Sequence, residues 1–453
     1  MNVIFLKQTS YITTLICCFI IGLFWLALPD PFMILAICAA PLAVIFSLRY
    51  TFWLVTLFVI FSFFRIHEAF PIIYDFKIPL ILSIFALGAI SFHLFISRDI
   101  HVFWHKSLTW LSLFWLIVII SVVFASSRPI ALEEFGATYW KIIIMTLAIT
   151  WVITEPRQIN QMFKTIIIAG FLIGCVTIYN AINNIDLVEG TRVSIGRSFG
   201  SILGDPNDLA LVLMFPLAFT ISQALEKQTP ILLRGFALLT CLILCIAIIE
   251  TKSRGGLLGT LAVFSYFAFK NIKNKALIIS LGTIGAITLY GLAGISERSS
   301  GGAAEIGIDA SAMGRIYAWE AATKMALANP LTGVGLENYY YNYYFYTPHW
   351  DGINHAVHST WFGVLAETGF IGLLIFIGFI VSLVKTSLVT LSMINEKTDC
   401  SLSVGANAAF GGLIGTIVSG TFLSQSFTWP IYILAALIIA IHRIIHSEMQ
   451  NEK

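Results

Sequence analysis

Fourteen apolar runs constrain the fold of this chain more than any other feature of its sequence. Each is about as long as the roughly 20 residues that an α-helix needs to cross a ~30 Å hydrocarbon core. Backbone groups cannot stay unpaired in lipid, so such segments must be helices. The second, third, tenth and last runs are short, and twelve or thirteen spans also fit the pattern. The runs lie near 11–29, 31–48, 50–64, 78–97, 108–125, 137–153, 161–183, 207–224, 231–249, 255–270, 276–294, 360–384, 403–421 and 428–442.

The composition agrees with a membrane protein. Hydrophobic residues make up 58% of the chain and charged residues 11%, whereas about a quarter of the residues in soluble globular proteins are charged. We therefore predict an all-α, polytopic transmembrane helical bundle of about 12–14 spans. The net charge of +2 and the lack of any basic run exclude nucleic acid as a partner. The first run follows Lys7 without a small-residue cleavage site, so we expect a retained helix rather than a signal peptide.

Lysine and arginine are distributed unequally between the segments that join the runs. With a cytoplasmic amino terminus, the inner segments carry fourteen of these residues and the short outer loops carry seven. The positive-inside rule then places both termini inside, and it places the loops near 184–206, 250–254 and 295–359 outside. None of the seven cysteines then forms an external disulfide or a CxxC metal pair.

This topology predicts four parts. Membrane helices occupy 1–183, and further helices with arginine-bearing outer loops occupy 184–294. A long outer loop follows over 295–359, and the last membrane helices occupy 360–453. Within the long loop, apolar residues at helical spacing predict a helix at the membrane surface from Met313 to Asn329, which Pro330 ends.

Histidines gather where the long loop enters the membrane. His349, His355 and His358 lie within ten residues, and His358 directly precedes an apolar run. A neutral imidazole accepts a proton near pH 7, so His358 is a candidate general base. A histidine at the start of a helix is also often ordinary polar surface, and His349 and His355 fit that interpretation better.

Arginines occupy the same predicted face. Arg192 and Arg197 precede the segment Gly204-Asp-Pro-Asn-Asp-Leu-Ala210, in which Asp205 is a candidate helix N-cap. Arg254 lies at the outer mouth of the bundle and is either a functional cation or a snorkelling anchor. Arg315 lies in the first turn of the surface helix, where a cation opposes the helix dipole and an anionic ligand would explain it.

Two further features of this region remain open. Glu367 lies nine residues beyond His358 inside an apolar run, and we expect a structural pairing with an arginine rather than a catalytic role. The tyrosine-rich segment forms either an interfacial aromatic belt or a platform for sugar rings. Its tyrosines are at 339, 340, 341, 343, 344 and 346.

Five motifs in order resemble those of the bacterial O-antigen ligase and O-antigen polymerase family. They are Asp205-Pro-Asn-x-x-Ala, Ser253-Arg-Gly, Gly314-Arg-x-x-x-Trp, Asn329-Pro-Leu-x-Gly-x-Gly335 and His358-Ser-x-x-Phe-x-x-Leu-x-Glu-x-Gly369. The first 180 residues resemble the family only in hydropathy. Ser359 stands where the family usually has Asn, and the motifs near 311 and 358 are also similar to exosortase-associated O-glycosylation ligases. This departure bears on the acceptor more than on the reaction.

The resemblance implies an integral-membrane glycosyltransferase of the GT-C class. Its donor would be an undecaprenyl-diphosphate-linked glycan, and its site would face the periplasm at the bacterial inner membrane. An O-antigen ligase with lipid A-core as acceptor is preferred over a polysaccharide polymerase or a protein O-glycosylation ligase. By this resemblance His358 is the base and Arg197, Arg254 and Arg315 bind the diphosphate. Asp205, Asn207, Glu367 and His355 are supporting residues, and no metal or cofactor is expected.

Two other classes remain as alternatives. A secondary transporter should bury ionisable groups at the midplane of several spans, whereas here only Lys141, and at most Lys164 or Glu367, intrude toward the midplane. A non-catalytic membrane scaffold would not need four arginines and a histidine on one face. The distribution of charge therefore favours glycosyl transfer.

Overall fold

The computed structural model describes residues 31–274 and 310–451, with single positions 19, 22, 276, 280, 282, 283 and 285. The expected spans near 11–29 and 276–294 fall outside the continuously described residues. The described chain is helical apart from one small antiparallel sheet, formed by β1 (Leu187–Val188) and β2 (Arg192–Val193).

The described ranges contain nine helices that are long and apolar enough to cross a membrane, or ten if the bent pair Ala39–Arg49 and Thr51–Phe63 forms one span. The protein is therefore a polytopic helical membrane protein, as the apolar runs predict. The nine are α5 (Ile78–Phe95), α6 (Lys106–Val123), the joined α7, η2 and α8 (Arg128–Val152), α9 (Pro156–Asn183), α10 (Pro206–Leu225), α11 (Ile231–Glu250), α16 (Thr360–Met393), α17 (Cys400–Gly420) and α18 (Trp429–Asn451).

Three of the predicted spans differ in the structure. The run near 255–270 forms α12 (Arg254–Asn271), whose polar end residues Arg254, Lys270 and Asn271 lower its mean hydropathy, so it is not among the nine candidate spans. The runs near 31–48 and 50–64 form α2 (Pro31–Arg49) and α3 (Thr51–Phe63), which count together as at most one span.

The remaining described elements are shorter. The long loop contains α14 (Ala310–Ala328) and α15 (Tyr339–Tyr346), and the first of these confirms the helix predicted over 313–329. Helix α15 lies in the tyrosine-rich segment and was not predicted. The others are α4 (Ile66–Ala69), η1 (Pro71–Phe76), η3 (Arg197–Phe199) and η4 (Ile202–Gly204).

The chain divides into two compact units. The smaller lies within Met1–Val55 and Leu80–His101, and the larger lies within Thr56–Pro79 and Val102–Lys453. All the candidate site residues belong to the larger unit.

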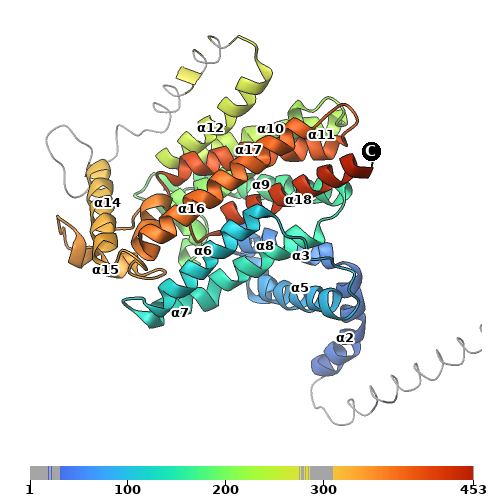
Figure 1. Ribbon diagram of the computed structural model, residues 1–453, viewed down its shortest axis with the longest axis horizontal. Coiled ribbons are helices and arrows are strands. Elements are labelled where there is room, and N and C mark those ends of the chain that lie inside the picture. Colours follow the sequence, from blue (N-terminus) through green and yellow to red (C-terminus); the bar gives the residue numbers. More distant parts are fainter. Residues whose placement is uncertain are drawn as a thin grey trace, which may run out of the picture. The chain divides into compact units, whose positions relative to one another are not determined.

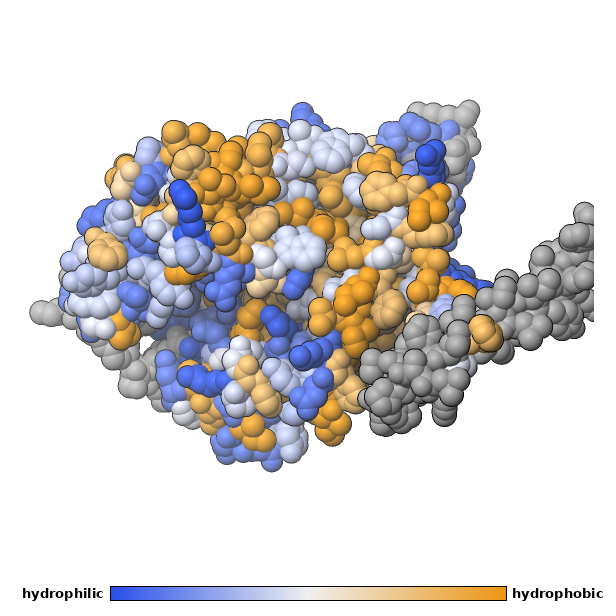
Figure 2. All heavy atoms as spheres, turned by 90° about the horizontal axis from the view of Figure 1, so that it is seen from below, coloured by the Kyte–Doolittle hydropathy of each residue, from blue (hydrophilic) through white to orange (hydrophobic). Residues whose placement is uncertain are grey.

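Helix α10 is the centre of the larger unit. Its most apolar stretch is 89% buried, whereas that of α11 is 28% buried and faces outward. Helices α9, α11, α12 and α17 pack around α10, and α14 packs against α16 at one end of the bundle (Figure 1). Figure 2 shows apolar side chains over much of one face, as expected for a surface in lipid, with more polar side chains toward the end of the larger unit where α14 and α15 lie.

Candidate functional site

A break in α16 receives the segment that follows α14. Gly369 interrupts the helix with φ 71° and ψ −172°. The amide of Phe370 donates to the carbonyl of Pro330 at 2.9 Å, and the amide of Val334 donates to the carbonyl of Ala366 at 2.8 Å. The loop therefore satisfies backbone groups that the break would otherwise leave unpaired. A Cβ at position 369 would lie 2.5 Å from the Pro330 carbonyl oxygen, so only glycine fits.

Glu367 supports the same junction. Its buried carboxylate accepts a hydrogen bond from the amide of Glu337 at 3.0 Å, and its carbonyl accepts one from Gly335 at 3.2 Å. The expected pairing of Glu367 with an arginine is not found in the described chain, where backbone amides donate to the carboxylate instead. Glu367 holds the start of α15 against α16.

The long loop has a small core of its own. Tyr339 and Tyr343 are buried in it, and the Tyr339 hydroxyl donates to the carbonyl of Ala318 at 2.9 Å. On α14, the Trp319 indole donates to the carbonyl of Val357 at 3.1 Å and stacks on Phe362 with ring centroids 5.1 Å apart. These contacts fix the backbone directly before His358.

His358 lies at the start of α16 with its backbone in the left-handed region, at φ 42°. Residues other than glycine rarely adopt this conformation, and it recurs at functional sites. Burial lowers the pKa of His358 to about 4, and the charges of Arg315 and Arg192 act in the same direction, while Asp205 opposes them. The ring is therefore neutral at pH 7. The same charges show that α10, α14 and β2 approach the histidine.

Arg192 is the centre of a buried hydrogen-bond network. Its guanidinium donates to the Asn207 side-chain oxygen at 3.0 Å and to the Thr251 carbonyl at 3.2 Å. The Ser253 hydroxyl donates to the same Asn207 oxygen at 3.0 Å. The Asp205 side chain caps α10 by accepting a hydrogen bond from the backbone amide of Asn207 at 2.6 Å. The network joins β2 to the amino-terminal ends of α10 and α12.

The connection between α17 and α18 closes the other side of the site. Arg254 is the first residue of α12, and the next residue, Gly255, has no room for a Cβ because Leu423 would lie 2.8 Å away. The Arg315 guanidinium lies over the ring of Phe422 at 5.9 Å. Phe422 and Leu423 were not predicted as part of the site.

The four arginines on the predicted outer face differ in their position relative to His358. Arg192 and Arg315 are among the main charges that act on His358, and Arg254 adjoins the Asn207 network. Arg197 lies in η3 with an exposed side chain, and it is not among those charges. Arg192, which was not chosen from the sequence, is buried in β2, whereas the chosen Arg197 is exposed.

The other predicted residues occupy the rim. His355 pairs with Asp351, with Nε2 and Oδ2 2.7 Å apart, and His349 packs against the ring of Tyr317. Tyr340, Tyr341 and Tyr344 are exposed. These three tyrosines remain available either to an interface or to sugar rings.

The assembled site is suited to an anion beside a proton acceptor. The amino-terminal ends of α10, α12 and α16 meet there, and helix amino termini attract negative charge. Arginine guanidinium groups bind phosphate oxygens in pairs. Within residues 31–274 and 310–451, no group of three His, Cys, Asp or Glu side chains is placed to hold a metal ion.

The match to a family model covers part of this site. Residues 239–377 match the model Wzy_C, described as O-antigen ligase. They form an O-antigen ligase family domain. The domain contains Arg254, Arg315 and His358, whereas Arg192 and Asn207 precede it. No curated protein matches the chain in sequence. The protein is thus a multi-pass membrane protein that carries a domain of the O-antigen ligase family, and this domain is of a kind that implies ligase- or polymerase-type glycosyl transfer.

Proposed function

We propose that the protein transfers a glycan from undecaprenyl diphosphate to an acceptor hydroxyl at the periplasmic face of the bacterial inner membrane. The preferred activity is that of an O-antigen ligase with lipid A-core as acceptor. A polysaccharide polymerase and a protein O-glycosylation ligase carry out the same chemistry with other acceptors. The observation that supports the proposal most is the neutral His358 beside Arg315 and Arg192.

The reaction requires one bond to form and one to break. The acceptor oxygen attacks the anomeric carbon of the donor sugar while its proton passes to the ring of His358. The bond between the sugar and the diphosphate breaks, and undecaprenyl diphosphate leaves with the electron pair. We assign stabilisation of this leaving group to Arg254 and Arg315, with Arg192 beside them, because fixed cations act where negative charge develops. The proposal needs no metal or cofactor.

Arg192 extends the set of site residues chosen from the sequence. Its guanidinium orients Asn207 and lies near His358, so we place it at the donor site in preference to the exposed Arg197. Asp205 and Asn207 would hold the end of α10 in place, and Glu367 would hold the loop. His355, paired with Asp351 at the rim, would be a supporting residue and is not required as a base.

The glycans of a deletion strain test the activity. Loss of a ligase leaves full-length polymer on the lipid carrier and lipid A-core without it. Loss of a polymerase leaves lipid A-core capped with a single repeat. Unchanged lipopolysaccharide together with altered glycosylation of a protein would identify the protein O-glycosylation ligase. No change in any lipid-linked glycan would contradict the proposed reaction.

A further inference from the structure

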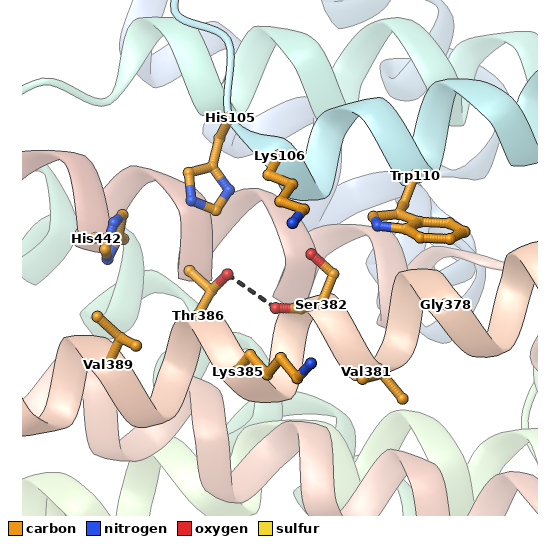
Figure 3. A pocket seen from close by; sticks show the side chains of 10 residues that line it. All are labelled: His105, Lys106, Trp110, Gly378, Val381, Ser382, Lys385, Thr386, Val389 and His442. Atoms are coloured by element: carbon orange, nitrogen blue, oxygen red, sulfur yellow. Dashed lines mark hydrogen bonds between the residues drawn. The ribbon is translucent and has the colours of Figure 1, made fainter.

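A pocket lies between α6, α16 and α18, away from the candidate site. Its volume is about 360 Å³. The residues that line it include Lys106, Lys385, His105 and His442, and none of its lining residues is acidic (Figure 3). Lys385 is sixteen residues beyond Gly369, which is roughly 24 Å along a helix at 1.5 Å per residue. Because His358 precedes that glycine, the pocket and the candidate site lie at opposite ends of α16.

Hydroxyl groups form the polar floor of the pocket. The Ser107 hydroxyl lies 2.9 Å from that of Ser382 and 3.1 Å from that of Thr386. The Thr386 hydroxyl also donates to the Ser382 carbonyl at 2.8 Å (Figure 3). These bonds join α6 to α16, so the floor is already ordered. Hydroxyls and the amino-terminal end of α6 both provide donors for an anion.

The two lysines give the pocket its charge. Lys106 and Lys385 are both exposed, and neither has an ion-pair partner in the described part of the chain. Figure 3 shows both ammonium groups beside the space that the pocket encloses. Burial lowers the pKa of His105, so this ring adds hydrogen-bonding capacity rather than charge. An anion in the pocket would meet two cations and no carboxylate.

The flanks of the pocket are apolar and face outward. Trp110 lies against Gly378, where a Cβ would be 2.5 Å from the indole ring. Val381 and Val389 on α16 are 44% and 45% exposed, on a helix that spans the membrane. A ligand in the pocket would therefore have its anion between the lysines and apolar chains along α16.

We propose that this pocket binds the phosphate group of an anionic phospholipid in the leaflet opposite the candidate site. A phosphate anion is the chemistry that the lysines and hydroxyls recognise, and the exposed apolar flank favours a lipid over free phosphate. Basic pockets between membrane helices on the cytoplasmic side bind anionic lipid headgroups in this way. In the proposed topology this is the cytoplasmic leaflet, although the binding chemistry does not depend on the glycosyl transfer.

Native mass spectrometry of the full-length, delipidated protein tests the proposal. Phosphatidylglycerol, phosphatidylcholine and inorganic phosphate would be titrated separately. We expect one phosphatidylglycerol to bind more tightly than phosphatidylcholine. Each lysine near a membrane surface strengthens the binding of an anionic lipid about fivefold. The double variant Lys106→Gln/Lys385→Gln should therefore weaken the binding of phosphatidylglycerol about 25-fold.

A double variant of two other exposed lysines is the matched control. Lys227→Gln/Lys397→Gln removes the same charge from loops outside the pocket, and it should leave the single tight site unchanged. An equal loss in both double variants would overturn the pocket assignment. Equal binding of the two lipids would overturn the anion preference, and competition by inorganic phosphate at equal concentration would overturn the assignment to a lipid. Circular dichroism of each variant separates lost binding from lost folding.

Discussion

The proton transfer that we propose for His358 would depend on the charges around its ring. In the free protein, burial and Arg315 lower the pKa of this histidine to about 4. The ring is then neutral but is a weak base. A bound diphosphate would place negative charge beside the same arginines and would raise the pKa of His358. We therefore expect His358 to be a stronger base when the donor is bound.

Replacing His358 tests its role as the base. His358→Asn removes the proton acceptor but keeps a residue type that tolerates a left-handed backbone. We expect turnover to fall by about 10²–10⁴, the usual contribution of general-base catalysis, while the donor still binds. His355→Ala should lose much less. Normal turnover of His358→Asn, or a failure confined to donor binding, would contradict the base role.

The pH dependence provides a separate test. Only the neutral ring accepts a proton, so activity should fall as the pH drops through the pKa of His358. For kcat/KM, which reports the free protein, the fall should occur near pH 4, because that is where the pKa lies. For kcat, which reports the donor complex, the fall should occur at higher pH. Identical profiles for the two quantities would show that the donor does not change the base.

Arg315 and Arg197 allow a comparison of two arginines that the sequence did not distinguish. Arg315→Lys keeps the charge but loses the paired contacts with phosphate oxygens and the stacking on Phe422. We expect kcat/KM with the lipid-linked donor to fall at least about tenfold. Arg197→Lys should cost less, because Arg197 is exposed in η3. A larger fall in kcat/KM for Arg197→Lys than for Arg315→Lys would indicate that Arg197 binds the diphosphate.

The residues that sequence reasoning missed depend on tertiary contacts. His358, Arg254 and Arg315 could be chosen because each lies in a motif that resembles the family's and near the start of a predicted helix. The role of Trp319 could not be predicted from its motif, because its contact with the Val357 carbonyl joins positions 38 residues apart. The place of Arg192 in the site could not be predicted either, because it lies in a strand pair too short to show a periodic sequence pattern.

The break in α16 explains why the segment Asn329 to Gly335 contains glycines. Gly333 has φ 62°, and a Cβ there would lie 2.3 Å from the Ala366 carbonyl oxygen. The sequence predicted one continuous apolar run over 360–384. It could not predict the break at Gly369, because the partner that satisfies the broken helix lies more than thirty residues earlier.

Gly333→Ala should destabilise this junction. A left-handed backbone alone costs an alanine about 1–2 kcal/mol, and contact with the α16 backbone adds to that cost. We expect a lower thermal midpoint and reduced activity in purified protein. Gly314→Ala is the control, since nothing lies within 4 Å of its Cβ position and its φ is not positive. Equal midpoints for the two variants would show that the loop does not need this junction.

For the whole molecule, the distribution of lysine and arginine predicts which face holds the candidate site. Tyr340→Cys and Lys397→Cys, each in a cysteine-free background, place a thiol at an exposed residue on either predicted side. In spheroplasts, a membrane-impermeant thiol reagent should label position 340 and not position 397. The opposite labelling would place the site in the cytoplasm and would overturn the proposed donor chemistry.

Hydropathy predicted most of the membrane helices but not how they pack against one another. It located the spans because each is apolar over its whole length. It could not show that α10 is central and α11 peripheral, since both are almost uniformly apolar and only packing distinguishes them. Nor could it show that small residues of α12 allow close approach to a neighbouring helix, as Gly256 does toward Ala210.

The anchoring of residues 329–335 in the α16 break divides the outer loop into a fixed and an exchangeable stretch. Chain length cannot change between Pro330 and Gly335, because both ends bond to α16. Between Thr347 and Asn354 the chain is irregular and mostly exposed, and no such backbone bond to α16 holds it. Under the proposed function, that stretch is free to lengthen or shorten for other acceptors while the proposed donor end stays unchanged.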